Sequence, residues 1–409
     1  MSDVPRYLVL NRFGNEFGEY HRYLRPHEGR MAYLTLAAGT SVLDTANALD
    51  TVVVADLDLD TVLPAARALT ARLGPFSGVV GISEWDLLTA ARLREALGVP
   101  GWSVDFVRRF RDKPYMKERV AGAGLRTPRF VELVPGADPT LLAEKVAADL
   151  GLPVIVKPRA GVASAGVLRV DTVGELAVAL SGRDLAAHEC EEFVDGRVLH
   201  VDGVRLGGHF HFVSASTYVN TCFAFANGAP LGSVLLDHGP LRDRVTGFAA
   251  RCLDALDLVD GPFHLELFHT PDDELVFLEV GLRPGGGPVP DVHRELFGID
   301  LLAETFRTTV GLPPATPATA HTEPTGGGWL IFPEPRPLPS RVVARTSPRG
   351  EVDGIYAEVL PEVGEVFDGT GGYLHVGGTF RFHGPDEVTV RRDVRRTIER
   401  YRLTTAPVR

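Results

Sequence analysis

A predicted β-hairpin over residues 261–281 constrains the fold more than any other stretch of the sequence. Two apolar runs with alternating side chains flank the turn residues Pro-Asp-Asp-Glu at 271–274, a pattern typical of antiparallel strands joined by a turn. If the turn is symmetric about Asp272 and Asp273, Glu266 and Glu279 lie directly opposite each other. The hairpin therefore brings two carboxylates together within apolar strands.

Two opposed carboxylates repel each other, so their place in apolar strands requires a reason. A hard divalent cation supplies one, because such ions prefer carboxylate oxygens; the alternative is a solvated face with ordinary glutamates. Arg283 and the glycines 285–287 follow the second strand, and glycine lets the backbone approach a ligand closely. Period-two alternation predicts one face with His264, Glu266 and Phe268 on the first strand and Leu275, Phe277 and Glu279 on the second.

The bulk properties exclude several classes of protein. A length of 409 residues predicts two to four domains, and a formal net charge of -11 argues against nucleic acid or an anionic membrane as the main partner. No apolar run is long enough to span a bilayer, and the N-terminus lacks the layout of a signal peptide. The three cysteines have no metal-ligand spacing. We therefore expect a cytoplasmic protein without disulfides.

Lysine is confined to one part of the chain. All other positive charge is carried by arginine. Such a bias leaves lysine mainly where a compact, flexible ammonium group is required, although the lysine at 145 lies in a predicted helix and is expected to be a surface charge. The lysines are Lys113, Lys117, Lys145 and Lys157.

Residues 1–108 read as alternating strands and helices. This alternation predicts a parallel, doubly wound sheet, and no dinucleotide fingerprint follows the first strand. Glu84 follows the last of these strands, at the edge where open α/β sheets place ligands. The predicted strands are Arg6–Asn11, Asp50–Asp56 and Gly78–Ser83, and the predicted helices are Thr61–Leu73 and Asp86–Leu97.

The middle of the chain contains a loop suited to phosphates. A strand at Pro153–Lys157 precedes a loop of small residues over 158–166, whose backbone N–H groups can fold over phosphates. It is not a Walker loop, because no Gly-Lys-Ser/Thr opens a helix. The remaining predicted elements are helices at 109–124, 139–150, 173–180, 241–256 and 386–402, strands at 129–133, 187–194 and 329–332, antiparallel strands over 196–218, and a Pro/Thr/Gly-rich linker beyond Leu312.

Taken in order, these motifs resemble the ATP-grasp superfamily, and within it the carboxylate–amine ligases typified by L-amino acid ligases. The motifs are Lys113 opening a helix that ends in Ala-Gly-Leu-Arg-Thr-Pro, VIVKP at 154–158, EEFVDG at 191–196, and Glu266 and Glu279 with Arg283. The stretches HVDG, HLELF and EVGLRPGGG point to the ligase branch. The resemblance covers residues 1–310 well and the tail only loosely.

The resemblance implies an α/β and α+β multidomain chain with the ATP-grasp fold. It implies an N-terminal Rossmann-like (pre-ATP-grasp) domain over 1–108 and a lid domain over 109–195. A central antiparallel-sheet domain over 196–312 and a small C-terminal α+β subdomain over 325–409 would follow.

The resemblance also implies roles for individual residues. ATP phosphates would be bound by Lys113, Lys157 and the loop residues Gly161, Ser164, Ala165 and Gly166; adenine by the segment Glu191, Glu192, Phe193 and Val194; and Mg²⁺ by Glu266 and Glu279. Arg283 would be catalytic, stabilising the transferred phosphoryl group or gripping the substrate carboxylate. Substrate contacts would come from Glu84, Arg283, Gly286, Gly287 and His200.

Two positions depart from the family pattern. Gly281 stands where many ATP-grasp enzymes have an asparagine that helps to hold a second metal, so the expectation is one or two Mg²⁺ ions. Val198 stands where many members have a glutamate, and His200 or Asp202 would have to replace that carboxylate.

The implied reaction is attack of a carboxylate on the γ-phosphate of ATP, followed by displacement of phosphate from the acyl phosphate by an amine. The implied partners are small carboxylates and amines, in particular amino acids, and the family allows a homodimer. Two alternatives are a biotin-carboxylase-like ATP-dependent carboxylase and a nucleotide-binding regulatory protein without catalysis. The lysines and both glutamates argue against the second alternative.

Overall fold

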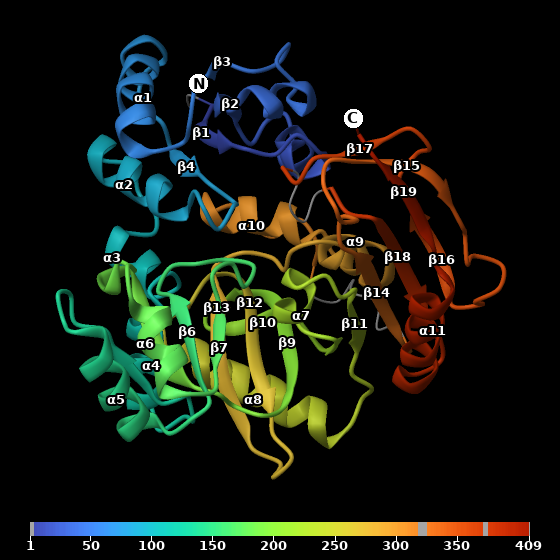
Figure 1. Ribbon diagram of the computed structural model, residues 1–409. Helices are drawn as coiled ribbons and strands as arrows, with labels where there is room; N and C mark the ends of the chain where they lie inside the picture. The colour runs from blue at the N-terminus through green and yellow to red at the C-terminus, as the bar shows by residue number, and fades with distance from the viewer. Residues whose placement is uncertain (1–3, 318–324, 371–374, 409) are drawn as a thin grey trace.

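The fold is described from a computed structural model that covers residues 4–317, 325–370 and 375–408. Part of the predicted linker, residues 318–324, lies outside the described residues. The described residues form four sheets, and the strands β9 to β13 of the largest one lie below the N-terminal sheet in the view of Figure 1. None of the helices within these ranges has the length and apolar character needed to cross a membrane.

The N-terminal part contains the predicted parallel sheet. Its strand order is β3-β2-β1-β4, and apolar side chains from both faces of β1 are buried against helices. The β2 strand was not predicted, because short 3-10 helices rather than an α-helix connect it to its neighbours. The elements are β1 (Arg6–Asn11), η1 (Glu16–Gly18), η2 (Tyr20–Tyr23), β2 (Arg30–Thr35), η3 (Ala37–Val42), β3 (Asp50–Val53), α1 (Leu59–Leu73), β4 (Gly78–Val80) and α2 (Leu87–Leu97).

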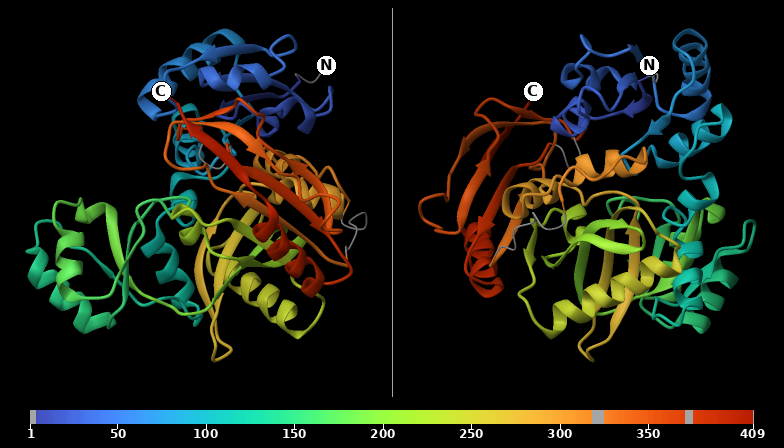
Figure 2. Two further views of the ribbon diagram at one scale, coloured as in Figure 1. Left: turned by 45° about the vertical axis from the view of Figure 1, so that its right-hand side comes forward. Right: turned by 180° about the vertical axis from the view of Figure 1, so that it is seen from behind.

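A second, antiparallel sheet with the order β5-β8-β6-β7 forms a lobe that stands away from the rest (Figure 2). Helices α5 and α6 pack against each other and contribute to its core, which includes the fully buried Cys190. The elements are α3 (Val104–Arg108), α4 (Lys113–Gly122), β5 (Phe130–Glu132), α5 (Pro139–Leu150), β6 (Val154–Pro158), β7 (Leu168–Val170), α6 (Val173–Leu180), η4 (Leu185–Ala187) and β8 (His188–Glu192).

The large sheet is antiparallel, with the order β13-β12-β9-β10-β11-β14-β18-β16. Its strands from the C-terminal stretch join those of 196–281 in one sheet, so the boundary between a central and a C-terminal domain stays a prediction. The elements are β9 (Arg197–Leu206), β10 (His209–Val219), α7 (Cys222–Ala226), β11 (Leu231–Leu235), α8 (Pro240–Ala255), β12 (Gly261–His269), β13 (Leu275–Gly281), α9 (Val289–Val292), η5 (His293–Phe297), α10 (Leu301–Thr309), β14 (Gly327–Phe332), β16 (Ile355–Val359), β18 (Gly378–His383) and α11 (Glu387–Arg400).

A three-stranded sheet, β17-β15-β19, completes the C-terminal part (Figure 1). It comprises β15 (Ser340–Arg345), β17 (Val366–Phe367) and β19 (Leu403–Pro407). Helix α11 packs on β14 and β11 of the large sheet, where Val390 and Val394 are fully buried in the apolar core.

The hairpin of β12 and β13 confirms the predicted pairing of Glu266 with Glu279 but corrects its geometry. The strands begin one residue out of the predicted register, with His269 opposite Leu275, and a bulge at Leu278 restores it at Glu266. A bulge puts an extra residue on one strand and changes which face later side chains occupy. The predicted shared face for Leu275, Phe277 and Glu279 is therefore wrong: Phe277 is fully buried opposite Leu267, on the other face from Glu279.

Alternation along β9 and β12 separates a dry face from a polar face. Leu199, Val201, Leu265 and Leu267 are fully buried in a core shared with α4 and α8. The residues between them, His200, Asp202, His264 and Glu266, are also buried but polar, and they lie on the opposite face. Buried polar groups require partners, so this face is where a functional site is expected.

Candidate active site

A cavity of about 360 Å³ lies between the second sheet and the polar face of the large sheet. Strands β6 and β8 and the loop after β6 contribute one side, and β12, β13 and the start of α7 contribute the other. The structure brings most of the predicted site residues together here: Lys113, Lys157, Gly161, Ser164, Ala165, Glu191, Glu192, Phe193, Val194, Glu266 and Glu279.

Lys157 is held in the wall of the cavity by acidic side chains of β8. Its Nζ lies 2.6 Å from Glu191 Oε1, and Lys117 Nζ contacts the other oxygen of Glu191 at 2.7 Å and Glu189 Oε1 at 2.9 Å. Burial by itself would raise the pKa of Glu191, but the two ammonium groups outweigh it and lower the pKa. The cluster keeps Lys157 charged in a nearly inaccessible position.

Lys113, at the start of α4, contacts both Glu279, one of the two predicted metal ligands, and the small-residue loop. Its Nζ lies 3.1 Å from Glu279 Oε2 and donates a hydrogen bond of 2.8 Å to the carbonyl of Gly161. In the loop, Ala163 and Ser164 both adopt left-handed backbone conformations, which non-glycine residues seldom occupy. Such strained backbone is concentrated at ligand-binding sites.

Glu266 is ionised and has fixed partners. The Tyr218 hydroxyl donates a hydrogen bond of 2.8 Å to Glu266 Oε1, and His264 Nε2 lies 3.5 Å from the same oxygen. Burial would raise the pKa of Glu266, yet the hydrogen bond and charge of His264, together with Tyr218, lower it to about 2. Glu279 is more accessible, with its side chain 34% exposed. Two opposed carboxylates, one firmly ionised, fit the oxygen donors that Mg²⁺ prefers.

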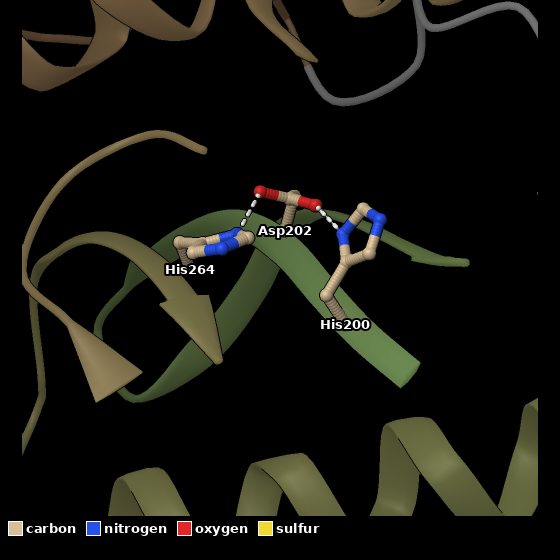
Figure 3. Close-up of side chains that lie close together, drawn as sticks. All are labelled: His200, Asp202 and His264. Carbon is tan, nitrogen blue, oxygen red and sulfur yellow. Dashed lines mark hydrogen bonds and ion pairs between the residues drawn. The ribbon is translucent and has the colours of Figure 1, made fainter. Parts of the chain in front are cut away.

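On the same polar face as Glu266, Asp202 bridges two histidines (Figure 3). His200 Nδ1 lies 2.6 Å from Asp202 Oδ2, and His264 Nδ1 lies 2.8 Å from Asp202 Oδ1. His200 Nε2 in turn contacts Ser233 Oγ at 2.6 Å. The ligand atoms of the three side chains lie within 4.8 Å of one another, close enough to hold a metal ion. Because the carboxylate lies between the two rings and uses one oxygen for each, we interpret the cluster as a hydrogen-bonded relay.

The acidic neighbours of His264 favour its protonated form. Burial would lower the pKa of His264, but Asp202 and Glu266 outweigh it and raise the pKa to about 9. Burial would likewise raise the pKa of Asp202, and the two imidazoles instead hold it well below its usual range. A protonated His264 therefore lies between two carboxylates, and it compensates part of the negative charge next to the predicted metal ligands.

Arg283 and Glu84 lie beside the cavity rather than in its wall. Arg283 Nε donates a hydrogen bond of 2.5 Å to Glu84 Oε2, and Glu84 Oε1 forms an ion pair with Arg111. Burial would raise the pKa of Glu84, but Arg283 and Arg111 lower it. Arg111 was missed at the level of sequence, because nothing distinguishes it from the many other arginines of the chain.

The strand that was expected to bind adenine offers one free donor. The N–H of Glu192 donates to the carbonyl of Arg129, and the N–H of Phe193 donates to that of Pro153. The N–H of Val194 donates no hydrogen bond to a backbone carbonyl within the described residues. The Glu192 side chain points to Arg126 and Arg129. Gly166, Gly286, Gly287 and His200 are not in the cavity wall.

Comparison with known proteins gives relatives by sequence and by structure. The chain is 25% identical over 261 residues to the L-arginine-specific L-amino acid ligase of Bacillus subtilis, a match that spans 61% of this chain and 62% of the relative. It is 28% identical over 252 residues to a D-alanine–D-alanine ligase of Mycobacterium sp. (strain KMS), over 56% of this chain and 61% of the relative. These matches thus span about six tenths of each relative. No protein-family model matches the chain.

The structural similarity extends over nearly the whole chain. The L-amino acid ligase from Bacillus licheniformis superposes with a TM-score of 0.76 at 18% identity, covering 99% of both chains. The chain has the ATP-grasp fold. The MgADP complex of the biotin carboxylase domain of the Hydrogenobacter thermophilus 2-oxoglutarate carboxylase is a second match, with a TM-score of 0.68 at 17% identity over 98% of this chain and 90% of that one. The ATP-grasp resemblance predicted from the motifs is confirmed.

Proposed function

We propose that this chain is an ATP-dependent ligase that joins a carboxylate to an amine. The carboxylate would attack the γ-phosphate of ATP, forming an acyl phosphate and ADP, and the amine would then displace phosphate to give an amide. The observation that carries the proposal is a single cavity that combines Lys113, Lys157 and the ionised Glu266 with Glu279. Phosphoryl transfer depends mainly on such positioning and charge.

The nucleotide would lie along this cavity. Lys113 and Lys157 would bind phosphates as point charges, and the loop from Gly161 to Gly166 would close over them with backbone N–H groups. Lys113 now contacts Glu279 and the loop, so ATP would exchange these contacts for phosphate oxygens. The unpaired N–H of Val194 would meet the adenine edge.

Glu266 and Glu279 would hold Mg²⁺, one or two ions, together with phosphate oxygens. When bound, the ion would neutralise part of the phosphate charge. Tyr218 and His264 keep Glu266 ionised and oriented, and Arg283 would bind the transferred phosphoryl group or the substrate carboxylate.

The substrate class proposed is amino acids. The support is indirect: the two relatives described above are ligases whose names specify L-amino acids and D-alanine. Glu84, His200 and the glycines at 286 and 287 remain proposed as substrate-side residues. A partner subunit of the same kind is compatible with this proposal but is not required by it.

The decisive experiment is ADP release from Mg²⁺-ATP in the presence of amino acids, tested singly and in pairs. We expect at least one pair to stimulate release and to yield an amide product by mass spectrometry. Bicarbonate with biotin tests the carboxylase alternative in the same assay. If ATP binds but no carboxylate or pair stimulates turnover, the ligase proposal is refuted and the regulatory alternative is favoured.

A further inference from the structure

A carboxylate from the N-terminal domain reaches the end of β13. Glu84 follows β4, and both of its oxygens are engaged by guanidinium groups, Oε2 by Arg283 at 2.5 Å and Oε1 by Arg111. The Glu84 side chain is only 11% exposed. The contact therefore crosses between two domains that are far apart in the sequence.

The same carboxylate occupies the space that a side chain at position 281 would need. A Cβ atom built on Gly281 would lie 2.8 Å from Glu84 Oε2, closer than real Cβ contacts. Gly281 does not have a positive φ, so its backbone conformation is open to any residue. A side chain at position 281 would therefore displace Glu84 Oε2, an atom at the end of a side chain that Arg283 and Arg111 hold in place.

Two of the three guanidinium nitrogens of Arg283 are held by hydrogen bonds, and the third is available to a ligand. Its Nε donates to Glu84, and its Nη1 donates to the carbonyl of Pro284 at 2.7 Å. Nη2 makes no hydrogen bond to any residue in the described part of the chain, and the side chain is 25% exposed. Two fixed donors leave the guanidinium plane one orientation, with Nη2 free for a ligand.

Arg111 extends the contact to the phosphate loop. Its Nη2 donates a hydrogen bond of 2.8 Å to the carbonyl of Ala160, while its Nη1 pairs with Glu84. One carboxylate thus orients Arg283 and, through Arg111, contacts the start of the loop that is proposed to cover the phosphates.

We propose that Glu84 is a positioning residue for Arg283, and that Gly281 is its matched partner because a side chain there would push the carboxylate out of its present position. This inference rests on the proposed ligase function. It revises the substrate contact predicted for Glu84: the carboxylate acts through Arg283 rather than on the substrate. It also gives a reason for the glycine at a position where many ATP-grasp enzymes carry asparagine.

A double-mutant cycle measured by melting temperature tests the pairing of Glu84 with Gly281 and does not depend on enzyme activity. The variants are Glu84→Ala, Gly281→Ala and the double variant. Gly247→Ala, inside α8, is the control: a Cβ there meets no atom within 4 Å, and alanine in a helix interior should leave the Tm unchanged or raise it. We expect Gly281→Ala to lower the Tm by about 2–4 °C in the wild-type background and by less than about 1 °C once Glu84 is alanine. Equal losses in both backgrounds would overturn the pairing.

A double-mutant cycle of kcat values with the same variants tests whether Glu84 positions Arg283. We expect Glu84→Ala and Gly281→Ala each to lower kcat for ADP release by roughly 10- to 100-fold, the size of effect expected when a reacting group shifts by about 1 Å. The double variant should be no slower than Glu84→Ala. The Kd of Mg²⁺-ADP, measured by calorimetry, should stay within about twofold, because ADP lacks the transferred phosphoryl group.

The outcomes separate the two proposals. If the wild type turns over and Glu84→Ala retains its kcat, or if the two single losses multiply, the positioning role is refuted while the ligase function stands. If the wild type binds Mg²⁺-ADP but never turns over, the ligase function is refuted and the positioning role with it. The cycle of melting temperatures still decides the pairing in that case.

Discussion

Glu266 and Glu279 face each other across β12 and β13 although the register of the hairpin changes one residue away. The change is a bulge at Leu278, which places Leu278 and Glu279 together in the cavity wall and sends Phe277 to the dry face. Bulges are common beside active sites, where they redirect a side chain. Here the bulge is what aligns the second carboxylate with the first.

The first prediction concerns this carboxylate pair. Glu279→Ala should lower the rate of ADP release by at least about 1000-fold, because one of two proposed Mg²⁺ ligands is lost. The dependence of nucleotide affinity on Mg²⁺, measured by calorimetry with and without the ion, should weaken in parallel. Glu274→Ala, in the exposed turn of the same hairpin, is the control and should behave as the wild type. Retained turnover in Glu279→Ala would contradict the metal assignment.

The second prediction concerns the lysines. Lys113→Ala and Lys157→Met should each raise the Kd of Mg²⁺-ATP by roughly 10-fold or more, because a charge-assisted contact to a phosphate is lost. Lys145→Ala is the matched control, since Lys145 pairs with Asp149 and is 65% exposed. If all three variants bind ATP alike, the phosphates are not bound by these ammonium groups.

The third prediction concerns the relay of Figure 3. Asp202→Asn should lower the free energy of unfolding by about 3 kcal/mol, because an amide cannot accept hydrogen bonds from both buried imidazoles in the way the carboxylate does. Urea denaturation at pH 7 measures the loss. Asp272→Asn, in the exposed turn, should unfold as the wild type does. An unchanged midpoint for Asp202→Asn would show that the relay contributes nothing to stability.

The fourth prediction is a pH dependence of stability. Glu28 pairs with Arg307 of α10 at 2.7 Å, and the hydrogen bonds from Arg307 lower the pKa of Glu28 to about 2. A depressed folded pKa contributes stability that is fully present above the unfolded pKa, about 4.3, and lost as the pH falls towards 2. Allowing for solvent screening, Glu28→Gln should lose about 1 kcal/mol at pH 7.

Denaturation curves from pH 7 down to pH 3 provide the check. The difference between Glu28→Gln and the wild type should shrink as the pH falls, and Glu16→Gln, at an exposed position, should show no difference at any pH. A constant difference would mean that the Glu28 carboxylate titrates normally in the folded protein.

The sequence alone predicted the fold and eleven of the residues that line the cavity. The assumed symmetry of the turn placed Glu266 opposite Glu279, and alternating strands and helices predicted the parallel sheet. The confinement of lysine to one segment pointed to Lys113 and Lys157, which line one cavity. These signals are local: each depends on spacing within one or two elements, which side-chain periodicity records directly.

The tertiary structure decided what depends on contacts between distant segments. The bulge at Leu278, the pairing of Glu84 with Arg283 and the role of Arg111 leave no periodic trace, because each follows from how separate elements pack. The glycine at position 281 looked like a missing ligand in the sequence. In the folded chain the space beside it is occupied by the carboxylate of Glu84, and only the contact between the segment after β4 and the end of β13 could decide that.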